Sequence, residues 1–241
     1  MLKVNYRQER VPVAGTLFPL VALALLGPLV WVGRPPVPVL GFLWGLTGMA
    51  LLGLIDDIAG SPGPKGFRGH LGLLGGQRKL SSGALKALAG GLVALTAAAG
   101  LGYHGWELPL DAVLVALAAN ALNLLDLRPG RATKGFLIFG AAVALGSRGP
   151  GSLFLSPLLG AATAYLPADL SRRAMLGDVG AYALGAGLGM ALVLDYSLRV
   201  RIAASGLLVF IHLYAERGSL STLIRGHSAL RWLDDLGADR E

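Results

Sequence analysis

The chain has 241 residues, of which 54% are hydrophobic and only 15% charged, and its formal net charge is +7 at pH 7. Soluble domains carry roughly 25% charged residues, and too many apolar runs here reach the roughly 20 residues that span a bilayer for a soluble helical core. The composition therefore predicts an all-α, polytopic integral membrane bundle. The positive charge is assigned to topology-setting loops rather than to nucleic-acid binding. The absence of cysteine excludes disulfides and thiolate metal sites.

The chain begins with a polar segment, MLKVNYRQERVPVAG, which is too polar for a cleavable signal peptide. No segment shows the alternation typical of a strand. We expect residues 1–216 to form a single transmembrane domain and residues 217–241 to form a cytoplasmic amphipathic tail, lying at the interface or as a lid over the cytoplasmic face. Eight helical spans are predicted within the domain: 14–32, 37–58, 80–101, 108–125, 132–146, 151–168, 176–194 and 198–216.

Lysine and arginine predict the orientation of these spans. If the N-terminus is cytoplasmic, 17 of the 21 Lys and Arg residues fall on the cytoplasmic side and 4 on the other. The excess of positive charge on cytoplasmic loops therefore predicts that both termini face the cytoplasm. This topology gathers four aspartates from three spans at the cytoplasmic face: Asp56, Asp57, Asp126 and Asp178.

The pair Asp56-Asp57 closes the apolar run VPVLGFLWGLTGMALLGLI. A carboxylate at the end of a membrane helix is costly unless it faces water, a cation or a partner, and two adjacent carboxylates repel each other. A divalent cation would relieve that repulsion. Contact with water, or with Lys65 or Arg68 in the following Gly/Pro-rich loop, is an alternative explanation.

The second motif is NALNLLD, which contains Asn120, Asn123 and Asp126. Spacing of three places these side chains on one helical face, and such a polar stripe must face the bundle interior or a hydrated cleft. With a metal and the basic residues that follow, it suits a ligand that bears a pyrophosphate. A seam of hydrogen bonds between helices is the alternative.

The third motif is AMLGDVGAYALGAGLG, in which Asp178 stands between Gly177 and Gly180. Glycine permits close approach of a backbone or a ligand. The alternative is a small-residue helix interface, with Asp178 as a favourable charge at a helix N-terminus.

Together these motifs resemble the polyprenyl-phosphate N-acetylhexosamine-1-phosphate transferases, which include phospho-N-acetylmuramoyl-pentapeptide transferase and its WecA-type relatives. The family's DD pair matches Asp56-Asp57, and its N-x-x-N-x-x-D motif matches the stripe that ends at Asp126. Its M-G-D-x-G-S-x-x-L-G motif is similar to MLGDVGAYALG, with Asp178 at the acidic position, and its Asn/Arg-Pro-Gly segment is similar to NYRQERVPVAG. The matches stand in family order and cover about residues 5–195.

The resemblance implies transfer of a sugar-1-phosphate from a UDP-sugar to undecaprenyl or another polyprenyl phosphate, with release of UMP, at the cytoplasmic face of the inner membrane. It implies Mg²⁺, with Mn²⁺ as a second candidate, bound by Asp178 with Asp56 or Asp57. Asp126, or the other member of the pair, would orient or deprotonate the lipid phosphate. Further substrate-binding candidates are Asn120, Asn123, Lys65, Arg68, Lys134 and His227. The expected partners are the lipid phosphate, the UDP-sugar, the membrane and a second copy in a homodimer.

The chain departs from the family at three points. It has eight expected spans where the family has about ten, and Pro129 stands where the family's D-G-L-D-G-L-A extension has its second aspartate. The family's cytoplasmic histidine-rich loop is not present, and only His227 lies in the corresponding region. An inactive, family-derived scaffold or accessory protein of envelope biogenesis therefore remains an alternative. An ion-coupled transporter is a weaker one, because transport predicts acidic residues near the midplane.

Overall fold

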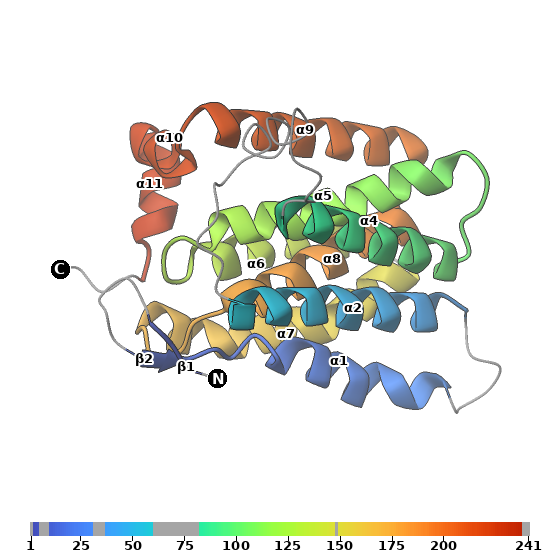
Figure 1. Cartoon of the computed structure of the whole chain (residues 1–241), viewed down its shortest axis with the longest axis horizontal. Coiled ribbons are helices and arrows are strands. Elements are labelled where there is room, and N and C mark those ends of the chain that lie inside the picture. Colours follow the sequence, from blue (N-terminus) through green and yellow to red (C-terminus); the bar gives the residue numbers. More distant parts are fainter. Residues whose placement is uncertain (1, 5–9, 31–36, 60–81, 148, 238–241) are drawn as a thin grey trace.

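The computed structural model describes residues 2–4, 10–30, 37–59, 82–147 and 149–237. Within these ranges the chain forms ten α-helices, one 3-10 helix and one small sheet, which confirms the all-α class (Figure 1). The elements in chain order are β1 (Leu2–Val4), β2 (Arg10–Pro12), α1 (Leu17–Leu26), η1 (Gly27–Val30), α2 (Val37–Ala59), α4 (Ser82–Gly100), α5 (Glu107–Leu125), α6 (Arg131–Gly146), α7 (Pro150–Leu170), α8 (Gly177–Asp195), α9 (Leu198–Arg217), α10 (Leu220–Gly226) and α11 (Ser228–Asp235).

Six of the helices are long and apolar enough to cross a membrane: α2, α4, α5, α7, α8 and α9. Each begins and ends within two residues of an expected span, because apolar length and the bordering polar residues define such helices well. The other two expected spans correspond to the shorter apolar stretch Leu17–Val30 and to α6, which has 16 residues. The chain is therefore a multi-pass membrane protein by helix hydropathy, with six candidate spans.

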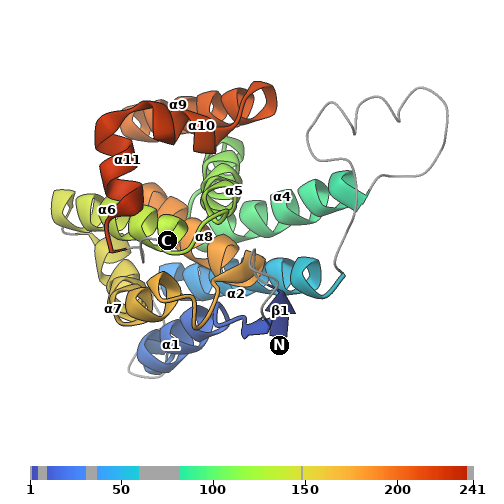
Figure 2. The same ribbon diagram turned by 90° about the vertical axis from the view of Figure 1, so that its left-hand side faces the viewer.

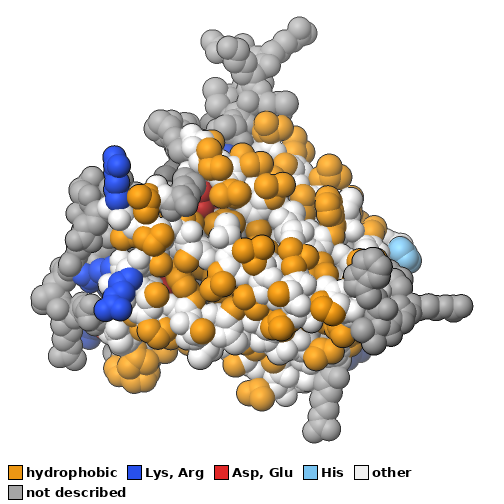
Figure 3. Space-filling model, turned by 90° about the horizontal axis from the view of Figure 1, so that it is seen from below, with side chains coloured by type: hydrophobic (Ala, Val, Ile, Leu, Met, Phe, Trp, Pro, Cys, Tyr) orange, Lys and Arg blue, Asp and Glu red, His pale blue; other side chains and the backbone are white. Residues whose placement is uncertain are grey.

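Helix α8 forms the centre of the bundle, and α2, α5, α6 and α7 surround it (Figure 2). Its Gly- and Ala-rich sequence lets neighbouring helices approach closely. On α2, a Cβ atom at Gly53 would collide with the backbone carbonyl of Asp178. Helices α4 and α9 are different, because only 17% and 11% of the residues in their apolar stretches are buried. Apolar side chains also cover the face seen in Figure 3, where Lys and Arg gather at one edge. Such a surface suits lipid.

One expectation about the N-terminus was wrong. No strand was predicted, yet β1 and β2 pair antiparallel, with Lys3 opposite Val11. A three-residue strand is too short to show a periodic pattern. The end of β2 and the residues after it pair with the turn that precedes α8: the Met175 N–H donates to the Pro12 carbonyl, and the Ala14 N–H donates to the Met175 carbonyl, each at 3.0 Å. The N-terminal segment thereby fixes the backbone leading to Asp178.

Candidate functional site

Three motifs meet at one end of the bundle, which we call the aspartate end. Both α2 and α5 run antiparallel to α8: Gly53 lies against Asp178, and at the other end of the contact Leu46 lies near Gly187. Ala118 on α5 lies against Gly185 on α8, and Val115 lies against Gly189, so the C-terminal end of α5 is level with the start of α8. The prediction that four aspartates share one end is confirmed. The acidic residues Glu107, Asp111 and Asp195 lie at the opposite, far end.

Asp57 joins α2 to the first turn of α8. Its side chain is 4% exposed, and its two carboxylate oxygens accept hydrogen bonds from the backbone N–H groups of Asp178 and Val179, each at 3.2 Å. The first N–H groups of a helix have no partner within the helix, and a carboxylate there is favoured by the helix dipole. Gly177 has φ +70°, and a Cβ there would lie 2.8 Å from Asp57 Oδ2. Asp57 is therefore an N-terminal cap supplied by another helix.

Asp56 has different surroundings from its neighbour. Its Oδ1 lies 2.7 Å from the ammonium of Lys86 on α4, a side chain that is 35% exposed. Its Oδ2 accepts a hydrogen bond from the Tyr182 hydroxyl at 3.4 Å. Tyr182 follows Asp178 by four residues and so shares its helical face, and it is within electrostatic range of the carboxylates of Asp56, Asp57 and Asp178. Asp56 and Asp178 therefore border the same face of α8.

Lys86 and Tyr182 are the site residues that the sequence prediction missed. Lys86 is one of the 17 Lys and Arg residues that the charge bias places on the cytoplasmic side, and Tyr182 lies inside the third motif without an expected role. The signal for Tyr182 was available, because a residue four positions after Asp178 lies on the same face of a helix. No pattern pointed to Lys86, since its partner is 30 positions away on another helix.

Asp126 ends α5 beside a small cavity of about 100 Å³. The cavity is lined by residues of the α5–α6 turn, the last turn of α7, the α7–α8 turn and β2: Val11, Asp126, Leu127, Arg128, Pro129, Asp169, Arg172, Ala174 and Met175. Asp126 and buried Asp169 are both within electrostatic range of Tyr165. Asp126 therefore borders the loop that leads into Asp178 but has a separate set of neighbours from Asp56. Asn123 and Asn120 lie on α5, partly exposed, about one and two turns before Asp126.

Other expected substrate-binding residues are distributed differently. Lys134 is 8% exposed, and its ammonium donates to the backbone carbonyls of Leu233, Asp234 and Leu236 at 2.6 to 3.1 Å. It thus contacts the end of α11 rather than the aspartates. His227 stands exposed between α10 and α11. Lys65 and Arg68 lie outside the described residues.

The donor set can be tested against a divalent cation. Among the residues that the structure describes, no group of three or more His, Asp or Glu side chains is arranged to hold a metal ion. Both oxygens of Asp57 accept backbone hydrogen bonds, so its carboxylate fits a supporting role better than a ligand role. Asp56 on α2 and Asp178 on α8 border the same face of α8, and this pair fits Mg²⁺ held by one or two carboxylates plus substrate oxygens, which is its usual binding mode.

Comparisons with known proteins do not assign the chain to a family. Neither the protein-family models nor the curated proteins compared with this chain gave a match.

Proposed function

We propose that the chain transfers a sugar-1-phosphate of the N-acetylhexosamine type from a UDP-sugar to undecaprenyl or another polyprenyl phosphate, with release of UMP. One observation carries the proposal: the carboxylate of Asp57 binds the backbone N–H groups of Asp178 and Val179. This contact brings the first and third family-like motifs together from positions 121 and 122 residues apart. We propose further that the chain is a divergent member of the polyprenyl-phosphate transferase superfamily.

The membrane arrangement suits this reaction. Six candidate spans agree with a lipid substrate, and the excess of Lys and Arg at the aspartate end favours a cytoplasmic location for it. We propose eight spans with both termini inside, with α1–η1 and α6 as the shorter two. A polyprenyl tail would then stay in the bilayer while its phosphate meets a water-soluble nucleotide sugar at the helix ends. A homodimer is part of the same proposal.

The residues divide the work as follows. Asp178 and Asp56 would hold Mg²⁺ or Mn²⁺, which would neutralise charge on the departing nucleotide phosphate. Lys86 can leave Asp56 for a substrate phosphate, because its side chain is partly exposed and long. Asp57 keeps the start of α8 in place. Asp126, with Asn120 and Asn123, would orient the lipid phosphate, which needs little deprotonation since the second pKa of a phosphate is about 6.

A second function, an inactive membrane scaffold, is favoured by a specific observation. The family's second aspartate after the Asn motif is replaced by Pro129, and the neighbouring Arg131 contacts the C-terminal helices. A scaffold would keep the capping by Asp57 for its fold. It would have no use for Asp56 beside a partly exposed lysine, so the two functions differ in what a change at Asp56 does.

The test offers the purified protein Mg²⁺, undecaprenyl phosphate and a panel of UDP-sugars, and measures release of UMP. We expect release with at least one UDP-N-acetylhexosamine, loss of release in Asp178→Asn, and loss on chelation of the metal. Equal readings for the wild type and Asp178→Asn with every donor would exclude the transferase and leave the scaffold.

A further inference from the structure

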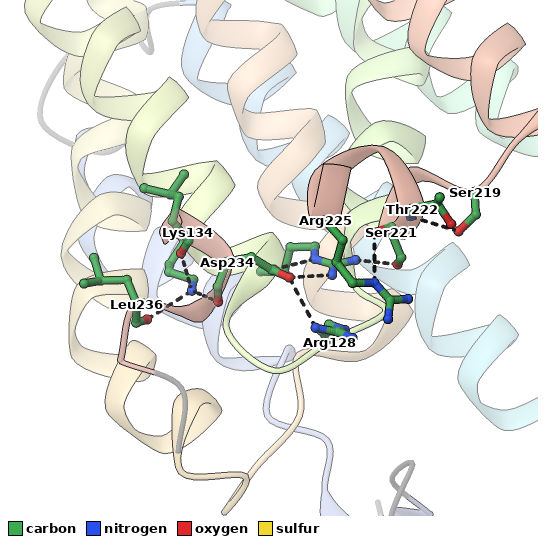
Figure 4. A network of polar contacts seen from close by, with 10 residues as sticks. Arg128, Lys134, Ser219, Ser221, Thr222, Arg225, Asp234 and Leu236 are labelled. Atoms are coloured by element: carbon green, nitrogen blue, oxygen red, sulfur yellow. Dashed lines mark hydrogen bonds and ion pairs between the residues drawn. The ribbon is translucent and has the colours of Figure 1, made fainter. Parts of the chain in front are cut away.

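The two C-terminal helices are attached to the bundle by charge. We call α10 and α11, with the residues that join and end them (219–237), the C-terminal tail, and we call Arg128, Arg131 and Lys134 the basic cradle. Arg131 is 5% exposed, and its Nε and Nη2 donate to the two oxygens of Asp234 at 2.7 Å each. Figure 4 shows Asp234 between Lys134 and Arg128. Its Nη1 donates to Ser221 Oγ at 2.9 Å. Arg131 thus binds the Asp234 carboxylate as a bidentate ion pair.

The direct ion pairs of the cradle converge on one carboxylate of the tail. Arg131 binds Asp234 on both oxygens and Arg128 reaches it at 3.5 Å, while Asp169 and Asp235 act on Lys134 through their charge alone. The ammonium of Lys134 meets backbone carbonyls at the end of α11, which offer only the partial negative charge of a helix C-terminus. A phosphate carries about −1.5 to −2 charge at pH 7 and three acceptor oxygens. It would therefore match the cradle better than one aspartate does.

Little else attaches the tail. Neither α10 nor α11 contributes a buried residue, and the large side chains of Leu230 and Trp232 are 43% and 64% exposed. The view in Figure 1 shows α11 lying across the end of the bundle rather than along it. Apolar burial supplies most of the free energy that holds an element in place, so this tail depends on its polar contacts. Such contacts can be exchanged for those of another anion.

We propose that the basic cradle is an anion site which the tail occupies through Asp234, and that a phosphate-bearing ligand displaces the tail to bind there. The cradle begins two residues after Asp126, next to the cavity that Asp126 and Arg128 line. This inference rests on the proposed function, since it gives the nucleotide sugar or the lipid phosphate a binding group outside the aspartates. The tail then covers the site until the substrate displaces it.

The experiment follows the tail directly. The chain has no cysteine, so Ala229→Cys on the exposed side of α11 accepts one environment-sensitive dye. Inorganic pyrophosphate added to the full-length protein in detergent should release the tail in a saturable way, and NaCl at equal ionic strength should not. Asp234→Asn should lower the half-saturating concentration about tenfold, because a charge-assisted hydrogen bond is lost. The matched control, Asp235→Asn, removes the same charge from the next, exposed residue and should leave that concentration within about twofold.

Separate arms identify the source of the phosphate and protect the inference from failures elsewhere. Release by UDP but not by undecaprenyl phosphate in the micelle assigns the site to the donor, and the reverse assigns it to the lipid. Asp178→Asn should still release its tail. Release without sugar transfer in the wild type would count against the proposed function alone. Two results would overturn the inference. One is sugar transfer while the tail stays in place, and the other is an Asp234→Asn protein whose tail is free but whose cradle does not bind added pyrophosphate.

Discussion

The two ends of the bundle use their carboxylates in different ways. At the far end, Asp111 is fully buried and both of its oxygens accept hydrogen bonds from Arg201 at 2.6 Å. Asp195 caps α7 there by accepting from the N–H groups of Gly151 and Ser152 at 2.8 and 2.7 Å. At the aspartate end, Asp57 caps α8 in the same manner, but Asp56 pairs with the partly exposed Lys86. Acidity alone does not mark a functional site, and the carboxylate with an exchangeable partner is the one available to a ligand.

The comparison predicts its largest effect at Asp56. Asp56→Asn should lower transferase activity about 10³-fold, the order found when one polar group at a reacting centre is removed. It should lower the free energy of unfolding less than Asp111→Asn does, because the partly exposed Lys86 can turn its ammonium to water when the carboxylate is lost. UMP release and thermal unfolding in the same detergent measure the two quantities. Full activity in a normally folded Asp56→Asn protein would remove Asp56 from the site.

The opposite pattern is expected at Asp111. Asp111→Asn leaves the buried Arg201 guanidinium with the partly exposed carboxylate of Glu107. The loss should therefore lie at or below the ~3–5 kcal/mol found when one partner of a buried pair is removed. The apparent melting temperature should fall markedly, while the turnover of the fraction that stays folded should not change. A selective loss of turnover with normal stability would mean that the far end also takes part in function.

The two caps allow a sharper version of the same contrast. In the wild type, backbone N–H groups donate to both oxygens of Asp57 and of Asp195. Asp57→Asn and Asp195→Asn each place an amide N–H₂ against one of these donors, and loss of such a cap lowers the free energy of unfolding by about 0.5–2 kcal/mol. We expect similar losses of stability in the two variants. Only Asp57→Asn should also lower activity, by about tenfold, because it alone lets the start of α8 and Asp178 shift. A kcat loss without a change in metal affinity would support positioning.

How far the sequence predicted this molecule depends on the range of the interaction. The helix boundaries and the shared end of the aspartates follow from apolar length and from charge bias, which act locally or on whole loops. The different roles of Asp56 and Asp57 could not be predicted, because adjacent residues on a helix point in directions 100° apart, and only packing decides what each one meets. Lys134 was expected at a substrate phosphate, yet it caps α11 about 100 positions away. Pairings that distant leave no local pattern.

The smallest expected effect separates the tail from both ends and depends on pH. Asp234 has its pKa below the usual 3.8; burial raises it, but the hydrogen bonds and charge of Arg131, with the charges of Arg128 and Lys134, lower it more. A carboxyl whose pKa is depressed when docked stabilises docking above its undocked pKa. That contribution is lost as the pH falls below 3.8 and through the docked pKa. The dye on α11 should therefore report release of the tail below pH 4 and none between pH 5 and 8.

The matched pair of variants decides whether Asp234 is the group responsible. Asp234→Asn should abolish the acid-induced release, since an amide has no proton to gain in this range, and its tail should be looser at neutral pH. Asp235→Asn removes the neighbouring exposed carboxyl and should keep the release. If both variants still released the tail at the same pH, protonation elsewhere on the aspartate end would control the tail. The cradle would then hold α11 through Lys134 and the carbonyls more than through the carboxylate.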